Sequence, residues 1–190
     1  MGSPRTPISA CIIAKDEADR IGPCLESVAF CDEVIVLDSG STDGTQQLCR
    51  DMGATVHEGD WPGYVEQKNR ILELASHEWV LSLDADERVD AELRTAIEAL
   101  RESALDQEAG PRAYALRRKT FLLGRWIMHG GWYPEWRTRL FRRGHSRWAG
   151  QNPHDKLETD GAVARIAEGH LEHFTYRNID DHIRQMNSFT

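Results

Sequence analysis

The first 109 residues alternate between short apolar segments and longer amphipathic ones, and this alternation limits the possible folds more than any other feature of the chain. Segments 8–14, 34–38, 54–58 and 79–83 are short and rich in β-branched residues, which is typical of buried strands. Each is followed by a segment with apolar residues at helical spacing. This order predicts an α/β fold in which a mainly parallel, Rossmann-like sheet carries helices on both faces.

A few residues set the expected helix boundaries. Pro23 suits the first turn of a helix but not its interior, so the first helix is expected to begin near Ile21. Gly53 ends the second helix, because glycine readily adopts the left-handed conformation that follows a helix. A third helix is expected over 64–75, and Asp90 caps a fourth that runs to Leu100.

Gly110-Pro111 interrupts the alternation. Beyond it, residues 112–120 and 137–143 read as two basic strands, and a polar helix is expected from Asn178 onward. A chain of 190 residues suits one domain, so we expect residues 110–190 to form a small mixed extension of the sheet built by residues 1–109. The last helix runs to Thr190 with no stop signal, which leads us to expect that the native chain continues.

Composition excludes several classes of protein. Hydrophobic residues make up 40% and charged residues 28% of the chain, which excludes a disordered protein. No apolar run approaches the roughly 20 residues of a membrane-spanning helix, and the N-terminus lacks the apolar core of a secretion signal. The four cysteines form no C-x-x-C pair and have no histidine at zinc spacing, so we expect free thiols and a cytoplasmic protein.

The net charge of −8 conceals a basic segment. Residues 117–147 hold nine Arg or Lys side chains and one acidic residue, Glu135, while the rest of the chain is strongly acidic. A basic, tryptophan-rich segment on an acidic body favours an anionic ligand or surface, and the acidic body argues against nucleic acid. The candidate ligand-binding residues are Arg137, Arg139, Arg142, Arg143, Trp132 and Trp136, because guanidinium groups grip phosphates and indole rings stack on sugars.

Carboxylates follow two of the predicted strands. Asp38 ends the second strand, and Asp84 and Asp86 form a D-x-D pair at the end of the fourth. Ligands of parallel α/β sheets bind at the carboxyl ends of the strands, and magnesium or manganese takes oxygen ligands from carboxylates and phosphates. The D-x-D pair therefore predicts a metal–diphosphate site, although an isolated D-A-D-E is also a common turn.

Four blocks appear in an order that resembles family 2 glycosyltransferases, which have the GT-A fold. They are Ile12–Glu17, Val34–Thr45 (VIVLDSGSTDGT), Glu66–Leu72 (EQKNRIL) and Trp79–Glu87 (WVLSLDADE). Three later blocks resemble the lipopolysaccharide core glucosyltransferases of the WaaE type: Phe121–Pro134, Arg139–Arg143 and Asn152–Leu157. The resemblance covers nearly the whole chain, and it makes residues 1–109 the nucleotide-sugar-binding half and 110–190 the acceptor-binding half.

The resemblance also implies roles by position. Asp86 would be the main metal ligand, Asp84 would lie against the ribose or the metal, and Asp155 would be the catalytic base. The nucleotide sugar would be bound by Asp16, Glu17, Asp38, Ser39, Lys68, Asn69 and Asp84. Two positions depart from the family, which usually has Asn-Glu in place of Asp16-Glu17 and His-Glu in place of His154-Asp155.

These roles describe an inverting, metal-dependent hexosyltransferase. A magnesium or manganese ion would stabilise the leaving diphosphate, and one carboxylate would take the proton of the attacking acceptor hydroxyl. The subgroup implies UDP-glucose as donor and an anionic glycolipid as acceptor. It also implies a peripheral position on the cytoplasmic face of the bacterial inner membrane.

Two other functions and one further metal ligand are considered. A sugar-nucleotide nucleotidyltransferase would share the acidic site, but it should begin with a glycine-rich loop where Ile13–Glu17 stands. A non-catalytic module that binds lipopolysaccharide or membrane would use the Arg/Trp segment, but it would not need carboxylates at strand ends. His170 and His173 are more often structural at such spacing, and only His173 is kept as a weak candidate metal ligand.

Overall fold

The computed structural model describes residues 5–105, 107, 109–152 and 154–175. The alternation predicted for the first half is present: β1 (Ile8–Ala14), α1 (Ile21–Ser27), β2 (Glu33–Asp38), α2 (Thr45–Asp51), β3 (Thr55–Glu58), α3 (Tyr64–Leu74), β4 (Trp79–Asp84), β5 (Glu87–Val89) and α4 (Ala91–Ser103). As expected, α1 begins at Ile21, and the Asp90 side chain caps α4 by accepting a hydrogen bond from Leu93 N.

The second half adds strands, with few helical residues. It contains β6 (Ala113–Leu122), β7 (Arg125–Ile127), β8 (Glu135–Arg142), β9 (Ser146–Gln151), β10 (His154–Thr159) and β11 (Val163–His173), with 3-10 turns at Gly130–Trp132 and Arg143–His145. The basic strands predicted at 112–120 and 137–143 correspond to β6 and β8. The helix expected from Asn178 onward falls outside the described residues.

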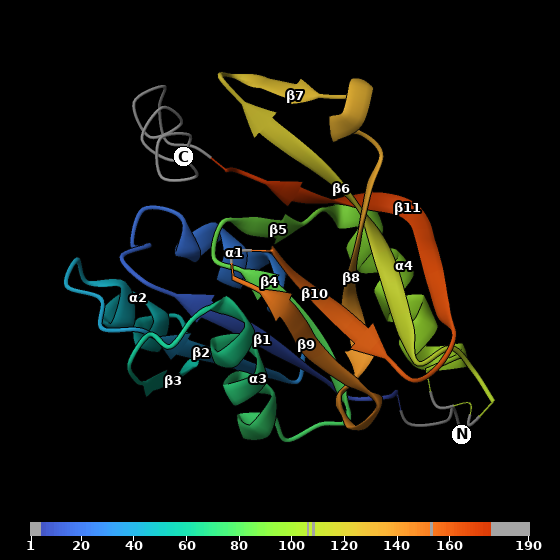
Figure 1. Ribbon diagram of the computed structural model, residues 1–190, viewed down its shortest axis with the longest axis horizontal. Coiled ribbons are helices and arrows are strands. Elements are labelled where there is room, and N and C mark those ends of the chain that lie inside the picture. The colour runs from blue at the N-terminus through green and yellow to red at the C-terminus, as the bar shows by residue number, and fades with distance from the viewer. Residues whose placement is uncertain (1–4, 106, 108, 153, 176–190) are drawn as a thin grey trace.

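Both halves build one nine-stranded sheet, in the order β3-β2-β1-β4-β8-β6-β11-β5 with β7 paired to β6 (Figure 1). The strands β3, β2, β1 and β4 are parallel, as the β-α alternation requires. β8 lies antiparallel between β4 and β6, so it joins the second half directly to the first. The sheet is therefore mixed, and β9 and β10 form a separate hairpin.

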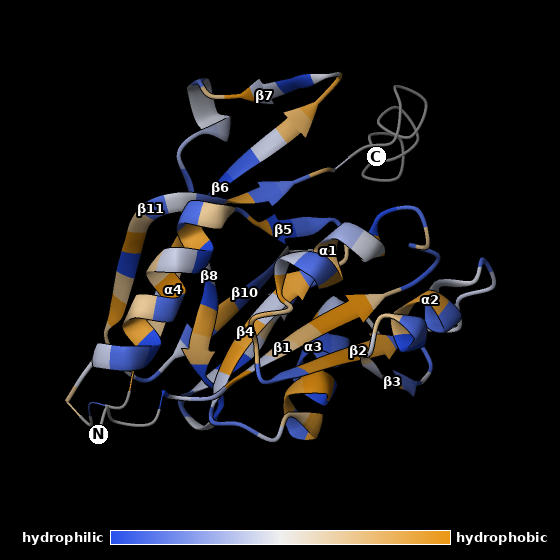
Figure 2. Ribbon diagram, turned by 180° about the vertical axis from the view of Figure 1, so that it is seen from behind, coloured by the Kyte–Doolittle hydropathy of each residue, from blue (hydrophilic) through white to orange (hydrophobic). Residues whose placement is uncertain are grey.

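Two apolar clusters cover the two faces of this sheet (Figure 2). Side chains alternate across a strand, so Ile12 of β1 joins the cluster with α1 and α4, while Ile13 joins the cluster with α3 and Trp148. Because β1 is buried along its whole length, it reads as a continuous apolar run. This burial holds the carboxyl end of β1 between the ends of β2 and β4.

Two further expectations from the sequence can be compared with the structure. The four cysteines are free thiols, as predicted, and burial raises the pKa of Cys31 to about 12 and that of Cys49 to about 11. Within the described ranges, no helix is long and apolar enough to cross a membrane.

Candidate active site

A cleft of about 1010 Å³ opens at the carboxyl ends of β1 and β4. Ala14 and Lys15 come from the end of β1, and Asp84 and Asp86 from the end of β4 and the turn after it. The opposite wall is built by β8 and by the β9–β10 hairpin, which contributes Asp155. The register explains the position of the acids, because Ile13 pairs with Asp84 on one side while Ala14 pairs with Asp38 on the other.

Asp84 lies between two cations. Its Oδ1 is 2.9 Å from Lys68 Nζ, and its Oδ2 accepts a hydrogen bond of 2.7 Å from Arg139. Burial alone would raise the pKa of Asp84, but the positive charges of Lys68 and Arg139 outweigh it and hold that pKa well below its usual range. Asp84 is therefore an ionised carboxylate at neutral pH.

Lys68 connects Asp84 with the predicted base. The Lys68 ammonium is almost fully buried and donates a hydrogen bond of 2.9 Å to Oδ2 of Asp155. It also lies 4.5 Å from the ring centroid of Trp148, where a cation–π contact adds to the ion pairs. One lysine of α3 thus holds together a carboxylate of β4 and a carboxylate of β10.

Asp86 faces the cleft beside a histidine. Its Oδ2 lies 3.5 Å from His173 Nε2 and 3.8 Å from Arg20. The other ring nitrogen of His173, Nδ1, is 3.4 Å from the hydroxyl of Thr120, and the backbone N–H of Phe174 donates to the Asp86 carbonyl. Both Asp86 and His173 belong to the lining of the cleft.

The Asp86–His173 pair fits a divalent cation that takes most of its ligands from a bound diphosphate. Magnesium sites commonly use one or two carboxylates together with substrate phosphates. Among the residues that the structure describes, no group of three or more His, Cys, Asp or Glu side chains is placed to hold a metal. A divalent cation held by Asp86 and His173 would therefore need further oxygen ligands, such as those of a diphosphate.

Asp38 and Ser39, both predicted to bind the nucleotide, are buried and do not belong to the lining of the cleft. The Asp38 carboxylate accepts N–H bonds from Gly40 and Ser41 at 3.0 and 2.8 Å, and one from the side chain of Gln46 at 2.6 Å. The Ser39 hydroxyl accepts a bond from Gln67. In this structure these groups hold the loop after β2 in shape.

Of the remaining residues predicted to bind the nucleotide, some line the cleft and others hold neighbouring segments in place. Glu17 lines the cleft and pairs with Arg20, whereas Asp16 turns to the loop after β2, where its carboxylate accepts from Thr42 N. Asn69 makes two hydrogen bonds to the backbone of Trp148, at 2.8 and 2.9 Å. The cleft lining therefore includes Glu17, Lys68 and Asp84 of the seven predicted residues, and Asn69 attaches α3 to β9.

The structure separates the four arginines predicted to bind an anionic ligand. Arg137 and Arg139 line the cleft together with Trp136, whereas Arg142 is buried at the last position of β8, beside the start of β4, where it donates to the carbonyl of Leu105. Arg143 donates to the carbonyl of Leu72 in the same region. Arg142 and Arg143 thus serve packing contacts, and Trp132 lies outside the cleft with 46% of its surface exposed.

Several cleft residues were not identified from the sequence, among them Trp61, Tyr64, Arg118 and Lys156. Trp61 and Tyr64 lie before and at the start of α3, with ring centroids 4.8 Å apart in an edge-to-face arrangement. Burial, followed by the negative charges of Asp84 and Asp86, raises the pKa of Tyr64. The sequence signal that could have identified them is a pair of aromatic residues on either side of Pro62-Gly63, in a loop that follows a strand. The other two residues, Arg118 and Lys156, carried no distinct signal.

Comparison with known proteins assigns the chain to one family of glycosyltransferases. The sequence profile described as "Glycosyl transferase family 2" matches residues 9–166. The protein named lipopolysaccharide core biosynthesis glycosyltransferase LpsC, from Rhizobium meliloti (strain 1021), is 35% identical over 198 aligned residues, which cover 98% of this chain and 70% of that protein. An uncharacterized glycosyltransferase of Rickettsia felis is 47% identical over 92 residues, which cover 48% of this chain but only 32% of its own length.

A solved structure shows the same fold. Residues 1–349 of S. aureus TarS, in complex with UDP-GlcNAc, superpose with a TM-score of 0.62 over 91% of this chain and 60% of that one. The sequence identity is 17%, so the similarity concerns the fold alone.

Proposed function

The chain belongs to glycosyl transferase family 2 and has a GT-A fold, and from this premise we propose that it transfers a hexose from a nucleotide sugar to a lipopolysaccharide core or related glycolipid acceptor, with inversion at the anomeric carbon. The observation that carries the proposal is the arrangement of Asp84, Lys68 and Asp155 in one cleft beside Asp86 and His173. The family match also disfavours the nucleotidyltransferase and the non-catalytic module.

Asp155 is the proposed catalytic base. In a direct displacement, the acceptor oxygen forms a bond to the anomeric carbon while the bond from that carbon to the diphosphate oxygen breaks. The acceptor proton then passes to a carboxylate, and the leaving group departs as a nucleoside diphosphate. Asp155 lies on β10 and lines the cleft, where its Oδ2 is 2.9 Å from the Lys68 ammonium.

Asp86 and His173 are proposed to hold a magnesium or manganese ion against the diphosphate, with Asp84 as a second carboxylate beside the ribose. A divalent cation at this position supplies charge stabilisation for the leaving group. The two cations beside Asp84 disfavour it as the main metal ligand, because Lys68 and Arg139 lie 2.9 and 2.7 Å from its oxygens and already neutralise its charge. Glu17 and Lys68 remain the proposed nucleotide-side contacts from the cleft wall, with Asp16, Asp38, Ser39 and Asn69 shaping that wall.

The acceptor side is proposed to be the wall formed by β8 and β10. Arg137 and Trp136 lie on β8, and Lys156, whose side chain is 68% exposed, lies on β10. Such groups suit an acceptor that carries phosphate or carboxylate groups on sugar rings. The identity with LpsC supports a lipopolysaccharide core acceptor, and the motif resemblance supports UDP-glucose as donor. The proposed location is the cytoplasmic face of the inner membrane.

The test is a UDP-release assay. The purified protein is incubated with UDP-glucose and manganese, with and without a core oligosaccharide acceptor, and UDP-GlcNAc and UDP-galactose serve as competing donors. We expect the acceptor to stimulate UDP release. NMR of the product should show that the new linkage has the anomeric configuration opposite to that of the donor sugar. Retention of the donor configuration would contradict the inverting mechanism, and no release with any nucleotide sugar would contradict the proposed activity.

A further inference from the structure

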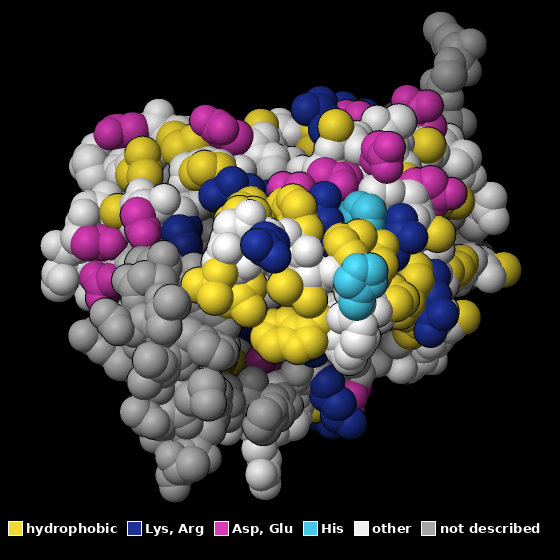
Figure 3. Space-filling view, turned by 90° about the horizontal axis from the view of Figure 1, so that it is seen from above, with side chains coloured by type: hydrophobic (Ala, Val, Ile, Leu, Met, Phe, Trp, Pro, Cys, Tyr) yellow, Lys and Arg dark blue, Asp and Glu magenta, His cyan; other side chains and the backbone are white. Residues whose placement is uncertain are grey.

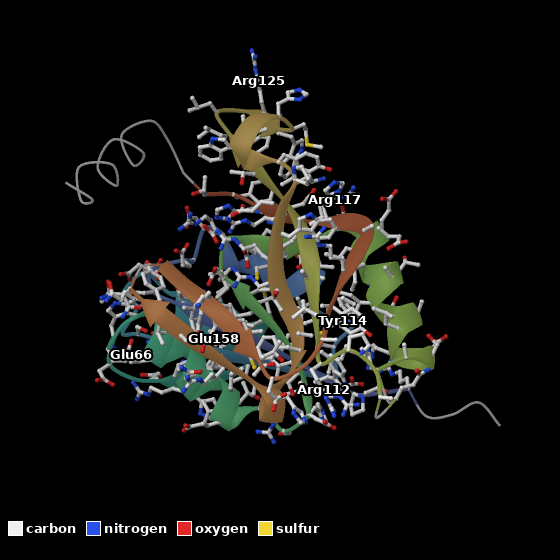
Figure 4. The ribbon with its side chains drawn as sticks, turned by 45° about the vertical axis from the view of Figure 1, so that its right-hand side comes forward. Glu66, Arg112, Tyr114, Arg117, Arg125 and Glu158 are labelled. Atoms are coloured by element: carbon white, nitrogen blue, oxygen red, sulfur yellow. The ribbon has the colours of Figure 1, made fainter. Side chains whose placement is uncertain are left out.

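Part of the basic segment forms an arm that extends beyond the body of the protein. We define the arm as residues 119–132, which comprise the outer part of β6, the strand β7 and the 3-10 turn Gly130–Trp132 (Figure 1). Figure 4 shows Arg125 at the far end of the arm, directed away from the body. The arm therefore presents a surface that the rest of the sheet does not cover.

This surface is apolar and basic. Leu123, Met128 and Trp132 are 63%, 36% and 46% exposed, and they lie within ten residues of one another. Arg125 and His129 are exposed among them, and residues 119–132 contain no Asp or Glu. Viewed along the arm, hydrophobic side chains gather with Lys, Arg and His side chains among them (Figure 3).

The tip of the arm carries a side chain that its backbone disfavours. Leu123 and Gly124 connect β6 to β7 with φ angles of 49° and 80°, as the two central residues of a type I′ turn require. Asn, Asp and Gly are the residues that suit this first position, and leucine there is strained. Burial within the chain does not compensate for this strain, because Leu123 is 63% exposed, and a contact with something outside the chain could do so.

Aromatic rings pack together at the base of the arm. The rings of Phe121, Trp126 and Phe174 form a cluster with centroids 5.1 to 5.4 Å apart, and the Lys119 ammonium lies 4.5 Å from the centroid of Trp126. β6 also continues into the cleft, where it supplies Arg118. Any surface that binds the tip is thereby held in a defined relation to the active site.

We propose that the arm docks on an anionic lipid bilayer, with Leu123 and Met128 inserted at the interface and Arg125 against the lipid phosphates. Exposed apolar side chains with Arg125 and His129 among them, in a segment that contains no Asp or Glu, fit such an interface. The inference rests on the proposed glycolipid acceptor, which is anchored in a membrane. Leu123 is five positions from Arg118, so the cleft lies at most about 17 Å along the strand from the tip, within reach of sugars that extend from the bilayer.

The experiment measures binding of the whole chain to sedimented vesicles of phosphatidylglycerol and phosphatidylcholine, compared with phosphatidylcholine alone. Leu123→Asn removes the apolar tip but suits the turn. Met128→Gln is matched by Met52→Gln, because Met52 is exposed to the same degree (37%) at the end of α2, away from the arm. Arg125→Gln tests the charge.

We expect the unchanged protein to bind anionic vesicles, and Leu123→Asn, Met128→Gln and Arg125→Gln each to lower the partition coefficient about tenfold. Met52→Gln should bind as the unchanged protein does, and Leu123→Asn should melt at the same or a higher temperature. Absence of binding to anionic vesicles, or equal losses for Met128→Gln and Met52→Gln, would overturn the proposal, as would self-association through the arm without vesicle binding. Since the assay uses no donor, failure of UDP release would count against the proposed function alone.

Discussion

The Lys68 ammonium lies 2.9 Å from Oδ2 of Asp155, although the two residues are 87 positions apart in the chain. The same ammonium is 2.9 Å from Oδ1 of Asp84. A single buried cation thus fixes the distance between the carboxylate on the nucleotide side and the proposed base on the acceptor side. Four predictions follow from this centre and from the groups around it.

Asp155→Asn should lower kcat by roughly 10²- to 10⁴-fold, because the amide has no basic oxygen for the acceptor proton. The KM for the nucleotide sugar should change little, since Asp155 lies on the opposite wall. UDP release in the presence of acceptor measures both constants. Glu158→Gln, on the same strand but away from the cleft lining, is the control and should retain full activity. Turnover of Asp155→Asn close to that of the unchanged protein would refute Asp155 as the base.

Lys68→Met should destabilise the protein by about 3 kcal/mol, because it leaves Asp84 and Asp155 close together without their shared cation. Lys156→Met removes an exposed lysine from the other side of the cleft, and it should cost less than about 0.5 kcal/mol. The free energies of unfolding come from urea titrations at pH 7. Equal effects of the two substitutions would show that the buried ion pairs do not stabilise the fold.

The stabilisation from Asp84 should depend on pH in the acid range. Its pKa in the folded protein is lowered, despite burial, by Lys68 and Arg139. A carboxyl group with a lowered folded pKa contributes stability that is complete above its unfolded pKa of about 4 and is lost as the pH falls toward the folded value. The difference in unfolding free energy between the unchanged protein and Asp84→Asn should be constant from pH 5 to 7 and shrink below about pH 4. A difference that grows on acidification would have the wrong sign for an ionised Asp84.

Asp86→Ala should abolish the part of UDP binding that depends on manganese, and His173→Ala should weaken it at least tenfold, because each would remove one of the two protein ligands. Calorimetric titration of UDP with and without the metal measures this part. Arg20→Ala is a comparison variant, since it alters the charge beside Asp86 and removes no proposed ligand. If manganese strengthens UDP binding to Asp86→Ala as much as to the unchanged protein, Asp86 is not a ligand.

The first half of the fold could be predicted because its pattern is local. Buried strands such as Ile8–Ala14 read as apolar runs, and Pro23 and Asp90 mark helix starts through their own backbone chemistry. The second half could be predicted only as two basic strands, because its strands pair with partners far away in the chain. β11, for example, pairs with β6 and β5, and the sequence of β11 does not indicate which strands are its partners.

The arginines show the same limit at the level of single residues. From the sequence, Arg137 and Arg142 looked equivalent, since both lie in one basic strand. In the structure Arg137 lines the cleft and Arg142 donates to the carbonyl of Leu105. Arg137 lies near the start of β8 and lines the cleft, whereas Arg142 is the last residue of β8 and pairs with Trp79 at the start of β4. Position along the strand therefore decides which arginine reaches the cleft.

The sequence alone therefore determined at which edge of the sheet the acidic residues lie. Parallel strands joined by helices must all end at one edge, and Asp38, Asp84 and Asp86 come at or directly after such ends. What only the tertiary structure decided was which of these acids face the cleft and which partners they have there. Asp38 became enclosed by its own loop, whereas Asp84 met Lys68 and Asp155. Those contacts depend on how α3 and the β9–β10 hairpin pack on the sheet, and packing between distant segments leaves no local pattern in a sequence.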